Sequence, residues 1–268
     1  MLRERFGVSE RRACRVVGQH RSTERLSPPV VCEEERRLRE FLIAFSKARP
    51  RWGWRRAAKG ARRAGWVVND KRVRRLWRQE GLRVPRRRRK KRLSGVGTQV
   101  GSFCPIRPDV VWALDFQFDT TTDGRTLKLL HVVDEHTREA HEILVRRTID
   151  ADEVVAVLDR LTPRHGAPGF IRMDNGPEMT ANAIRDWCSS SGSKTFYIEP
   201  GSPWENPFVE SFGSRVRDEV LAVEMFTSLL EAKIVIEDWR IMYNTTRPHS
   251  SLGWTPPSVY ADACRRGL

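Results

Sequence analysis

VVWALDFQFD, at residues 110–119, alternates apolar and polar side chains along its whole length. One face would carry Val110, Trp112, Leu114, Phe116 and Phe118. The opposite face would carry Val111, Ala113, Asp115, Gln117 and Asp119. Because successive side chains of a β-strand point to opposite faces of a sheet, this pattern predicts a strand with one apolar side. We expect the rest of the fold to form around this strand.

The segments that follow predict more strands and helices in a definite order. Two strands, at 125–135 and 139–147, come after short connections, so the three strands would form an antiparallel meander. A helix, a strand, a helix, a strand and a helix are then predicted at 150–161, 169–174, 180–192, 194–200 and 206–221. This order indicates one mixed α/β domain that ends near residue 225.

The order of strands also predicts where a functional site would lie. The helix after the third strand allows a right-handed crossover to a parallel fourth strand. If that strand lies beside the first, the sheet has its switch point between them, and open α/β sheets place their sites there. Asp115 lies on the first strand and Asp174 ends the fourth. The topology would therefore bring these two distant carboxylates into one site.

A third carboxylate, Glu210, is predicted in the first turn of the helix at 206–221. We expect Asn206 to cap that helix and Pro207 to occupy its first position. The apolar stripe of the helix consists of Val209, Phe212, Val216 and Val220. Glu210 lies beside this stripe on a polar face, so its stem would be buried and its carboxylate free.

Three carboxylates in one pocket repel each other, and a divalent cation reverses that repulsion. Mg²⁺ prefers oxygen ligands and also binds phosphates, and two such ions can hold the attacking and leaving oxygens of a phosphoryl transfer. Taken alone, each carboxylate is better explained as a surface residue, because the chain has 34 acidic residues. Their shared placement favours a metal site. Asp119 is a rival for Asp115, since it lies on the same strand face.

Positive charge is concentrated in the first hundred residues. That part has a formal net charge of +22, whereas the remaining 168 residues carry −7. So uneven a distribution indicates contact with a polyanion, and nucleic acid is the commonest one. The five scattered cysteines contain no C-x-x-C pair, which fits a reducing cytoplasm, and no apolar run is long enough to predict a membrane segment. His131, His136 and His141 are expected at strand ends and on the surface.

Boundaries along the chain are predicted from these changes in composition. We expect a short helical segment at 1–31, a three-helix DNA-binding region at 32–84, a basic linker at 85–107, the α/β domain at 108–225 and a C-terminal helix with a signature segment at 226–268. In the third helix of the 32–84 region, one stripe is apolar and another is basic. The candidate DNA contacts of the basic stripe are Lys71, Arg74, Arg75 and Arg78. The linker adds Arg86, Arg87, Arg88, Arg89, Lys90 and Lys91. An ordinary solvated basic face is the alternative for the helix.

Several motifs resemble one known family. WALDFQFD, RMDNGPEM and SPWENPFVESF are similar to the three segments that carry the acidic residues of retroviral-integrase-like DDE transposases. Asp174 and Glu210 have 35 residues between them, which matches the family's second spacing. YNTTRPHSSLGWTPP, at 243–257, closely resembles the C-terminal signature of the OrfB transposases of the third insertion-sequence family. The segment at 51–84 resembles the family's helix-turn-helix region.

The resemblance implies an RNase-H-like catalytic core in which a five-stranded mixed sheet is flanked by helices. It implies Mg²⁺ or Mn²⁺, two ions in all, held by Asp115, Asp174 and Glu210. The implied reaction cleaves the ends of an insertion element and joins them to target DNA through a 3′-OH. The motif alignment favours Asp115 over Asp119. Glu178 is expected to cap or flank the next helix, and its removal to leave some activity.

The resemblance also concerns partners. The family's active enzyme is often a fusion with an upstream OrfA, so we expect an OrfA partner or fusion. We also expect a homo-oligomer on DNA and no association with a membrane. Arg247 and His249 would line a loop near the DNA, or else form a structural turn around Pro248. Two other functions remain open: a metal-dependent RNase-H-like nuclease that cuts without joining, and a non-catalytic DNA-binding product that lacks OrfA.

Overall fold

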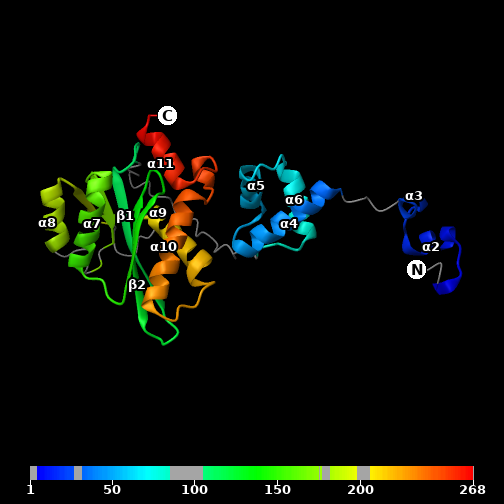
Figure 1. Cartoon of the computed structure of the whole chain (residues 1–268), viewed down its shortest axis with the longest axis horizontal. Coiled ribbons are helices and arrows are strands. Elements are labelled where there is room, and N and C mark those ends of the chain that lie inside the picture. Colours follow the sequence, from blue (N-terminus) through cyan, green and yellow to red (C-terminus); the bar gives the residue numbers. More distant parts are fainter. Residues whose placement is uncertain are drawn as a thin grey trace, which may run out of the picture.

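The stretch at 110–119 forms the central strand of the sheet. A computed structural model of the chain describes residues 5–26, 32–84, 105–174, 176, 182–197 and 206–267. Its five-stranded sheet has the order β3-β2-β1-β4-β5 (Figure 1). The strands are β1 (Val111–Thr120), β2 (Thr126–Asp134), β3 (Ala140–Arg146), β4 (Phe170–Met173) and β5 (Lys194–Tyr197). β1 pairs antiparallel with β2 and parallel with β4. The predicted meander, crossover and mixed sheet are thus confirmed.

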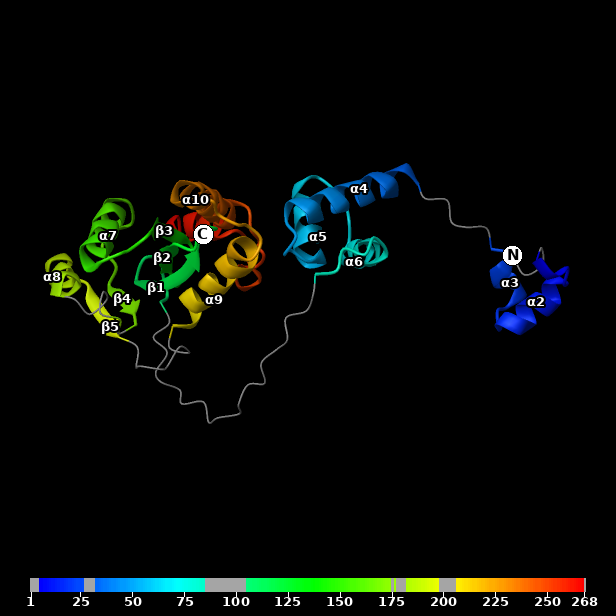
Figure 2. The same cartoon turned by 90° about the horizontal axis from the view of Figure 1, so that it is seen from below.

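Helices cover both faces of the sheet, as Figure 2 shows. On one face Trp112 and Leu114 pack with α7 (Ala151–His165) and α8 (Asn182–Ser191). On the other face Ala113 packs with α9 (Pro207–Val216) and α10 (Leu229–Thr245). The expectation of a single apolar side was therefore wrong, because the small Ala113 lets a helix approach the polar side of β1 as well.

The helix predicted at 206–221 is divided in two. Asn206 is the N-cap of α9 and Pro207 is its first residue, as expected. After Val216 the chain continues as a π-helical turn, η2 (Arg217–Leu221), in which the Ala222 amide donates to the Arg217 carbonyl at 2.8 Å. A π turn holds one more residue than an α turn, so it changes the direction in which the following side chains point.

Three elements follow η2 and pack against the sheet domain. They are α10, a 3₁₀ turn η3 (Ser250–Leu252) and α11 (Pro257–Arg265). Ser228 caps α10 by accepting a hydrogen bond from the Glu231 amide, and Asn244 near its end bonds both backbone polar groups of Ala140 on β3. None of the described helices is long and apolar enough to cross a lipid bilayer.

Three helices form a separate core ahead of the sheet domain. They are α4 (Glu33–Ala48), α5 (Trp54–Arg63) and α6 (Asp70–Gln79). Val73, Leu76 and Trp77 are buried in this core, as the predicted stripe requires. Asn69 caps α6 by accepting from the Arg72 amide. A smaller pair of helices, α2 (Glu10–Val17) and α3 (Arg21–Glu24), lies nearer the N-terminus, in the part predicted as a short helical segment.

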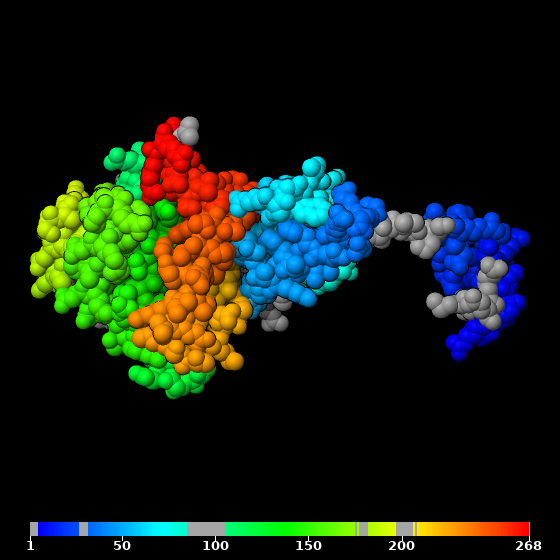
Figure 3. All heavy atoms as spheres, in the orientation of Figure 1, coloured from blue at the N-terminus to red at the C-terminus, as the bar shows by residue number. Residues whose placement is uncertain are grey.

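The three-helix unit meets the sheet domain along a defined seam. In Figure 3 its blue and cyan spheres abut the orange and red spheres of the C-terminal part. Arg63 on α5 donates to the carbonyl oxygens of Thr246 at 2.8 Å and of Trp254 at 3.4 Å. The Trp52 indole donates to Glu219 on η2 at 3.1 Å. The signature segment at 243–257 thus lies at this seam.

Candidate functional site

Two of the predicted carboxylates lie at the switch point of the sheet. In the parallel pairing of β1 with β4, Ala113 is opposite Arg172. Two further steps in the same register bring Asp115 level with Asp174, which directly follows β4. The Gly176 amide donates to Oδ1 of Asp174 at 3.1 Å, so the turn after the strand orients that exposed carboxylate. Asn175 and Glu178 lie outside the described residues.

Helix α9 brings the third carboxylate to the same place. Gly213, one turn after Glu210, lies close to β1. A Cβ atom at Gly213 would lie 3.5 Å from Oε1 of Gln117 and 3.9 Å from Oδ2 of Asp115. Residues three apart on a helix share a face, so the exposed Glu210 also lies on the side that approaches Asp115.

The electrostatics of Asp115 reflect this gathering of negative charge. Burial raises the pKa of its carboxyl group, and the nearby charges of Glu210 and Asp174 raise it further, to about 7. Asp119, the rival on the same strand face, pairs with Leu127 in β2. It lies four residues beyond Asp115, which is about 13 Å along a strand. The geometry therefore groups Asp115, and not Asp119, with the other two carboxylates.

Three polar side chains hold α9 on the sheet, and none of them was predicted to have a role in the site. Gln117 donates to the Gly213 carbonyl at 3.2 Å, and His131 lies 2.8 Å from Oε1 of Gln117. Asn206 donates to the Leu114 carbonyl at 3.2 Å instead of capping its own helix with its side chain. Gln117 shares a strand face with Asp115, and this alternation was the one signal that could have identified it.

Two of the three histidines expected at strand ends and on the surface, His131 and His141, are buried. His131 lies opposite Asp115 in the pairing of β1 with β2 and is fully buried, and burial lowers its pKa to about 3. It is therefore neutral and can act as a hydrogen-bond partner of Gln117. His141 is also buried, and its Nε2 lies 2.9 Å from Asp109. The prediction failed because it considered helical spacing only. His131 and His141 lie on β-strands, where every second side chain points into the core.

Asp109, His141 and His165 form a second group near the opposite end of β1. Their ligating atoms lie within 4.8 Å of one another. Asp109, however, already accepts hydrogen bonds from Trp112 at 3.1 Å and from Arg265 at 3.1 Å. Burial lowers the pKa of His165 to about 4, with a further contribution from His141. With a guanidinium already bound to its carboxylate, this group ties α11 to the sheet.

The predicted basic stripe of α6 lines an open groove of about 1090 Å³. Lys71, Arg74, Arg75 and Arg78 all line it and are exposed. Arg75 is also paired with Glu35 at 2.8 Å, whereas Arg74 and Arg78 form no ion pair with any residue that the structure describes. Their binding to DNA stays a prediction. The linker cations at 86–91 lie outside the described residues.

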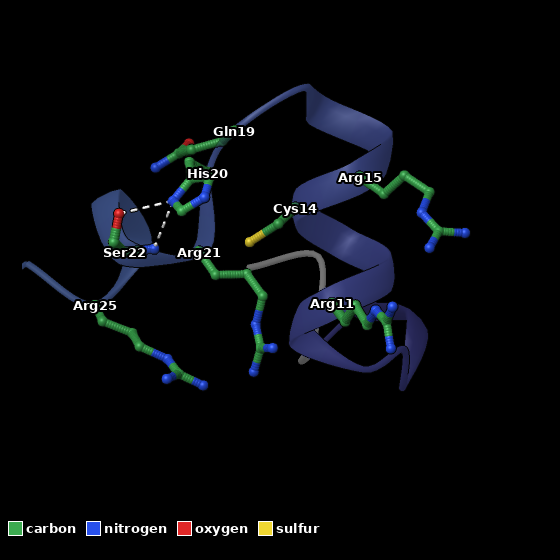
Figure 4. A pocket seen from close by; sticks show the side chains of 8 residues that line it. All are labelled: Arg11, Cys14, Arg15, Gln19, His20, Arg21, Ser22 and Arg25. Atoms are coloured by element: carbon green, nitrogen blue, oxygen red, sulfur yellow. Dashed lines mark hydrogen bonds between the residues drawn. The ribbon is translucent and has the colours of Figure 1, made fainter.

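A second basic hollow, of about 670 Å³, lies in the N-terminal helices. Figure 4 shows the side chain of the buried Cys14 pointing from α2 toward the turn at His20, with arginines on both sides. The arginines that line it are Arg11, Arg15, Arg21 and Arg25. Arg21 and Arg25 both pair with Glu10, so this hollow is partly neutralised.

Arg247 and His249 do not lie in an exposed loop. The side chain of Arg247 is 1% exposed. Its Nε and Nη2 atoms both donate hydrogen bonds to Glu219, the shortest at 2.7 Å. His249 lies 2.9 Å from Arg247 and packs edge-on against the ring of Tyr243. The charge of Arg247 is already paired with Glu219, and the position of this turn near DNA stays a prediction. The alternative of a structural turn describes both residues.

The comparisons with known proteins agree with this architecture. An HTH-like domain model matches residues 33–90, and two integrase core domain models match residues 105–203 and 191–257. The chain is 39% identical over 260 residues to an uncharacterized 31.7 kDa protein of insertion element IS407 from Burkholderia multivorans, covering 97% of this chain and 93% of that protein. It is also 39% identical to an uncharacterized 39.2 kDa protein of insertion element IS476 from Xanthomonas euvesicatoria, covering 96% and 74%.

More distant matches extend the comparison. The transposase for IS904 of Lactococcus lactis is 26% identical over 85% of this chain and 94% of its own length. The catalytic core domain of HTLV-2 integrase, solved with magnesium, superposes with a TM-score of 0.48 at 14% identity, covering 58% of this chain and 98% of that one. From the identity and coverage of the IS407 and IS476 proteins, the chain belongs to the OrfB transposases of the third insertion-sequence family, with an HTH-like domain ahead of an integrase core.

Proposed function

We propose that the protein cleaves DNA at the ends of its insertion element and joins those ends to target DNA. Asp115, Asp174 and Glu210 would hold two Mg²⁺ or Mn²⁺ ions. The observation that carries this proposal is the approach of α9 to β1 at Gly213, beside the switch point of the sheet. It gathers three carboxylates from distant parts of the chain into one place.

The residues fit hard divalent cations. All three candidate ligands are carboxylates, and oxygen ligands are the ones that Mg²⁺ and Mn²⁺ prefer. Among the described residues, the carboxylate oxygens of these three side chains do not all lie within 4.8 Å of one another. Two ions about 4 Å apart need ligand atoms that are spread more widely than this. Bound ions would supply neutralisation of the charge that develops on the phosphate.

The chain's own residues would then orient the reaction. Asp115 sits on the central strand and Glu210 on a helix that Gln117 and Asn206 fasten to that strand. Both carboxylates are therefore held by packed elements, which favours a precise ligand geometry. The open groove on α6 would bind the DNA backbone outside the site.

A single assay separates the three possible functions. Purified protein is incubated with labelled DNA that carries the element's ends, target DNA and Mg²⁺. Joined products support transposition, whereas cleavage without joining favours the nuclease. Binding without any chemistry would favour a non-catalytic product and would overturn the proposed reaction. Repeating the assay with added OrfA tests whether the expected partner or fusion is required, and sizing the protein–DNA complex tests for a homo-oligomer.

Metal binding should release a proton from Asp115. Because its pKa is raised to about 7, the folded protein without metal holds this proton at pH 6, and a ligand must lose it. We expect the apparent Mg²⁺ affinity to rise with pH until about pH 7, by up to about tenfold per unit. Calorimetry at pH 6 in buffers of different ionisation enthalpy measures the release. Asp115→Asn protein should release none, and equal heats in all buffers for the original protein would contradict the assignment.

The same raised pKa has a consequence for stability without metal. Between the ordinary pKa of 3.8 and about 7, the folded protein holds a proton that the unfolded chain releases. Stability therefore falls as pH rises through this range. Mg²⁺ should reverse the trend above pH 7, because it binds only the folded protein.

The α6 groove gives a separate prediction about DNA binding. Arg74→Ala and Arg78→Ala should each lower the slope of log K against log salt by about 1, because each removes one phosphate contact. Duplex binding is measured by fluorescence anisotropy at several salt concentrations. Arg37→Ala is a matched control, since Arg37 is an exposed arginine of α4 that does not line the groove. An unchanged slope in both groove variants would show that this face does not meet DNA.

A further inference from the structure

A pocket of about 320 Å³ at the seam between the two units has an unusual charge. Four separate segments of the chain line it: α5, the turn between β2 and β3, α9 and the signature segment. Its arginines are Arg56, Arg138, Arg215 and Arg247, and its hydroxyl groups are those of Ser211, Ser250, Ser251 and Tyr243. No carboxylate is found among the described residues that line it.

One carboxylate, Glu219, contacts two of these arginines and is already paired. Nε and Nη2 of Arg247 both donate hydrogen bonds to the Glu219 carboxylate, whereas the nearest guanidinium nitrogen of Arg56 lies 4.0 Å from it. Nε of Arg56 is buried and has no hydrogen-bond acceptor. Arg215 forms no ion pair with any residue in the described part of the chain. The pocket therefore contains more cationic hydrogen-bond donors than the protein satisfies.

The surrounding groups respond to this excess of positive charge. Burial and the charge of Arg247 lower the pKa of Arg56 to about 10, which is far below the usual arginine value. Burial also lowers the pKa of His249 to about 3, and Arg247, Arg56 and Arg215 add to the effect. His249 is thus neutral. An anion in the pocket would relieve the repulsion between the guanidinium groups.

The pocket is distinct from the three carboxylates, although both use α9. An α-helix turns by about 100° per residue, so Phe208, Ser211 and Arg215 share one face. Glu210 points about 130° away from the centre of that face. One face of α9 therefore approaches β1 with Glu210, and the other presents Ser211 and Arg215 to the pocket.

We propose that this seam pocket binds one phosphate group of the DNA backbone, through Arg56 and Arg215 with the Ser211 hydroxyl. Guanidinium groups bind phosphate oxygens with two parallel hydrogen bonds, and serine hydroxyls donate a further one. Because Arg56 belongs to the HTH-like domain and Arg215 to the integrase core, the phosphate bridges the two. Bound DNA would thereby fix the HTH-like domain against the helix that carries Glu210.

The inference rests on the proposed DNA-binding function, and it needs none of the metal chemistry. All measurements are therefore made in EDTA. Ser211→Glu places a carboxylate in the pocket at an exposed helical position, so the protein should still fold. Ser189→Glu, at an exposed position of α8, is the matched control for the added charge. Arg215→Gln removes a guanidinium directly, and Arg160→Ala on α7 is its control.

The first arm uses inorganic phosphate. The melting temperature is followed as phosphate replaces chloride at constant ionic strength, since a ligand of the folded state raises it. The original protein and the Ser189→Glu control should be stabilised, and Ser211→Glu should bind phosphate at least about tenfold more weakly. The second arm uses duplex DNA. Ser211→Glu and Arg215→Gln should lower the salt slope by about 1, and the controls should leave it unchanged.

Each outcome decides something. Loss of both responses in the pocket variants supports a backbone phosphate. If the pocket variants lose phosphate binding but keep the salt slope of DNA binding, the pocket does not bind DNA and is a site for free phosphate. Variants that match the original protein in both arms overturn the pocket itself. If the original protein binds phosphate but no DNA, the proposed function fails and the pocket remains.

Discussion

Asp174→Asn protein is expected to lose both strand cleavage and strand joining, by at least about 1,000-fold. Asp174 follows β4 at the switch point and lies near Asp115, which Glu210 also approaches. Replacing a carboxylate by an amide removes one negative ligand, and with it about 4 kcal/mol of the charge stabilisation that bound ions give the transition state. Asp115→Asn and Glu210→Gln should cause losses of the same order.

Single-turnover assays on labelled element-end DNA with Mg²⁺ measure this loss, and binding of the same DNA is measured in EDTA. Binding should be unchanged, because the variants lose negative charge and no phosphate contact. Asp119→Asn is the matched control: it makes the same chemical change on the same strand face but farther along β1. If Asp119→Asn were inactive and Asp115→Asn active, the assignment of the strand ligand would be reversed.

Glu219→Gln protein is expected to be less stable by about 3 kcal/mol. Glu219 and Arg247 form an ion pair whose side chains are 6% and 1% exposed. The Gln variant keeps the shape of the side chain but leaves the Arg247 guanidinium buried without a counter-charge, which usually costs 3–5 kcal/mol. The Trp52 indole also loses its charged acceptor. For a chain of this size we expect a melting temperature lower by about 10 °C.

Thermal unfolding at several pH values tests this expectation. Burial by itself would raise the pKa of Glu219, but the hydrogen bonds and charge of Arg247 hold it below its ordinary value of 4.5. The pair's contribution is therefore present above that value and is lost as the pH falls through the lower, folded-state pKa. Glu237→Gln, which breaks the more exposed pair with Arg240 on α10, should cost less than about 1 kcal/mol. Equal effects of the two variants would contradict the role of burial.

Sequence periodicity was a good guide to elements whose pattern is local. The alternation around Asp115 predicted β1, and the two short connections predicted the meander that precedes the crossover. The start of the helix at Asn206 and Pro207 was predicted because it depends on residues only one or two positions away. The candidate site followed from this topology, since the carboxyl ends of neighbouring parallel strands meet at one edge.

Contacts between distant segments were not predictable in the same way. Nothing near Arg247 in the sequence reveals that Glu219 will neutralise it, so this ion pair was not predicted. Asn206 has the sequence position of a cap, yet its side chain bonds the Leu114 carbonyl on β1. Likewise, the seam pocket exists only because α5 packs beside the signature segment.

The π turn after α9 makes the length of this segment as important as its composition. Its widened turn, closed by the Ala222 amide and the Arg217 carbonyl, sets the direction in which Glu219 points toward Arg247 and Trp52. Deleting one residue between Val216 and Glu219 would restore a regular α-helix but rotate Glu219 by about 100° and shift it by about 1.5 Å. Substitutions between Val216 and Glu219 keep this spacing, whereas single-residue deletions should be excluded. Related sequences are therefore expected to differ in this segment by substitutions and to conserve its length.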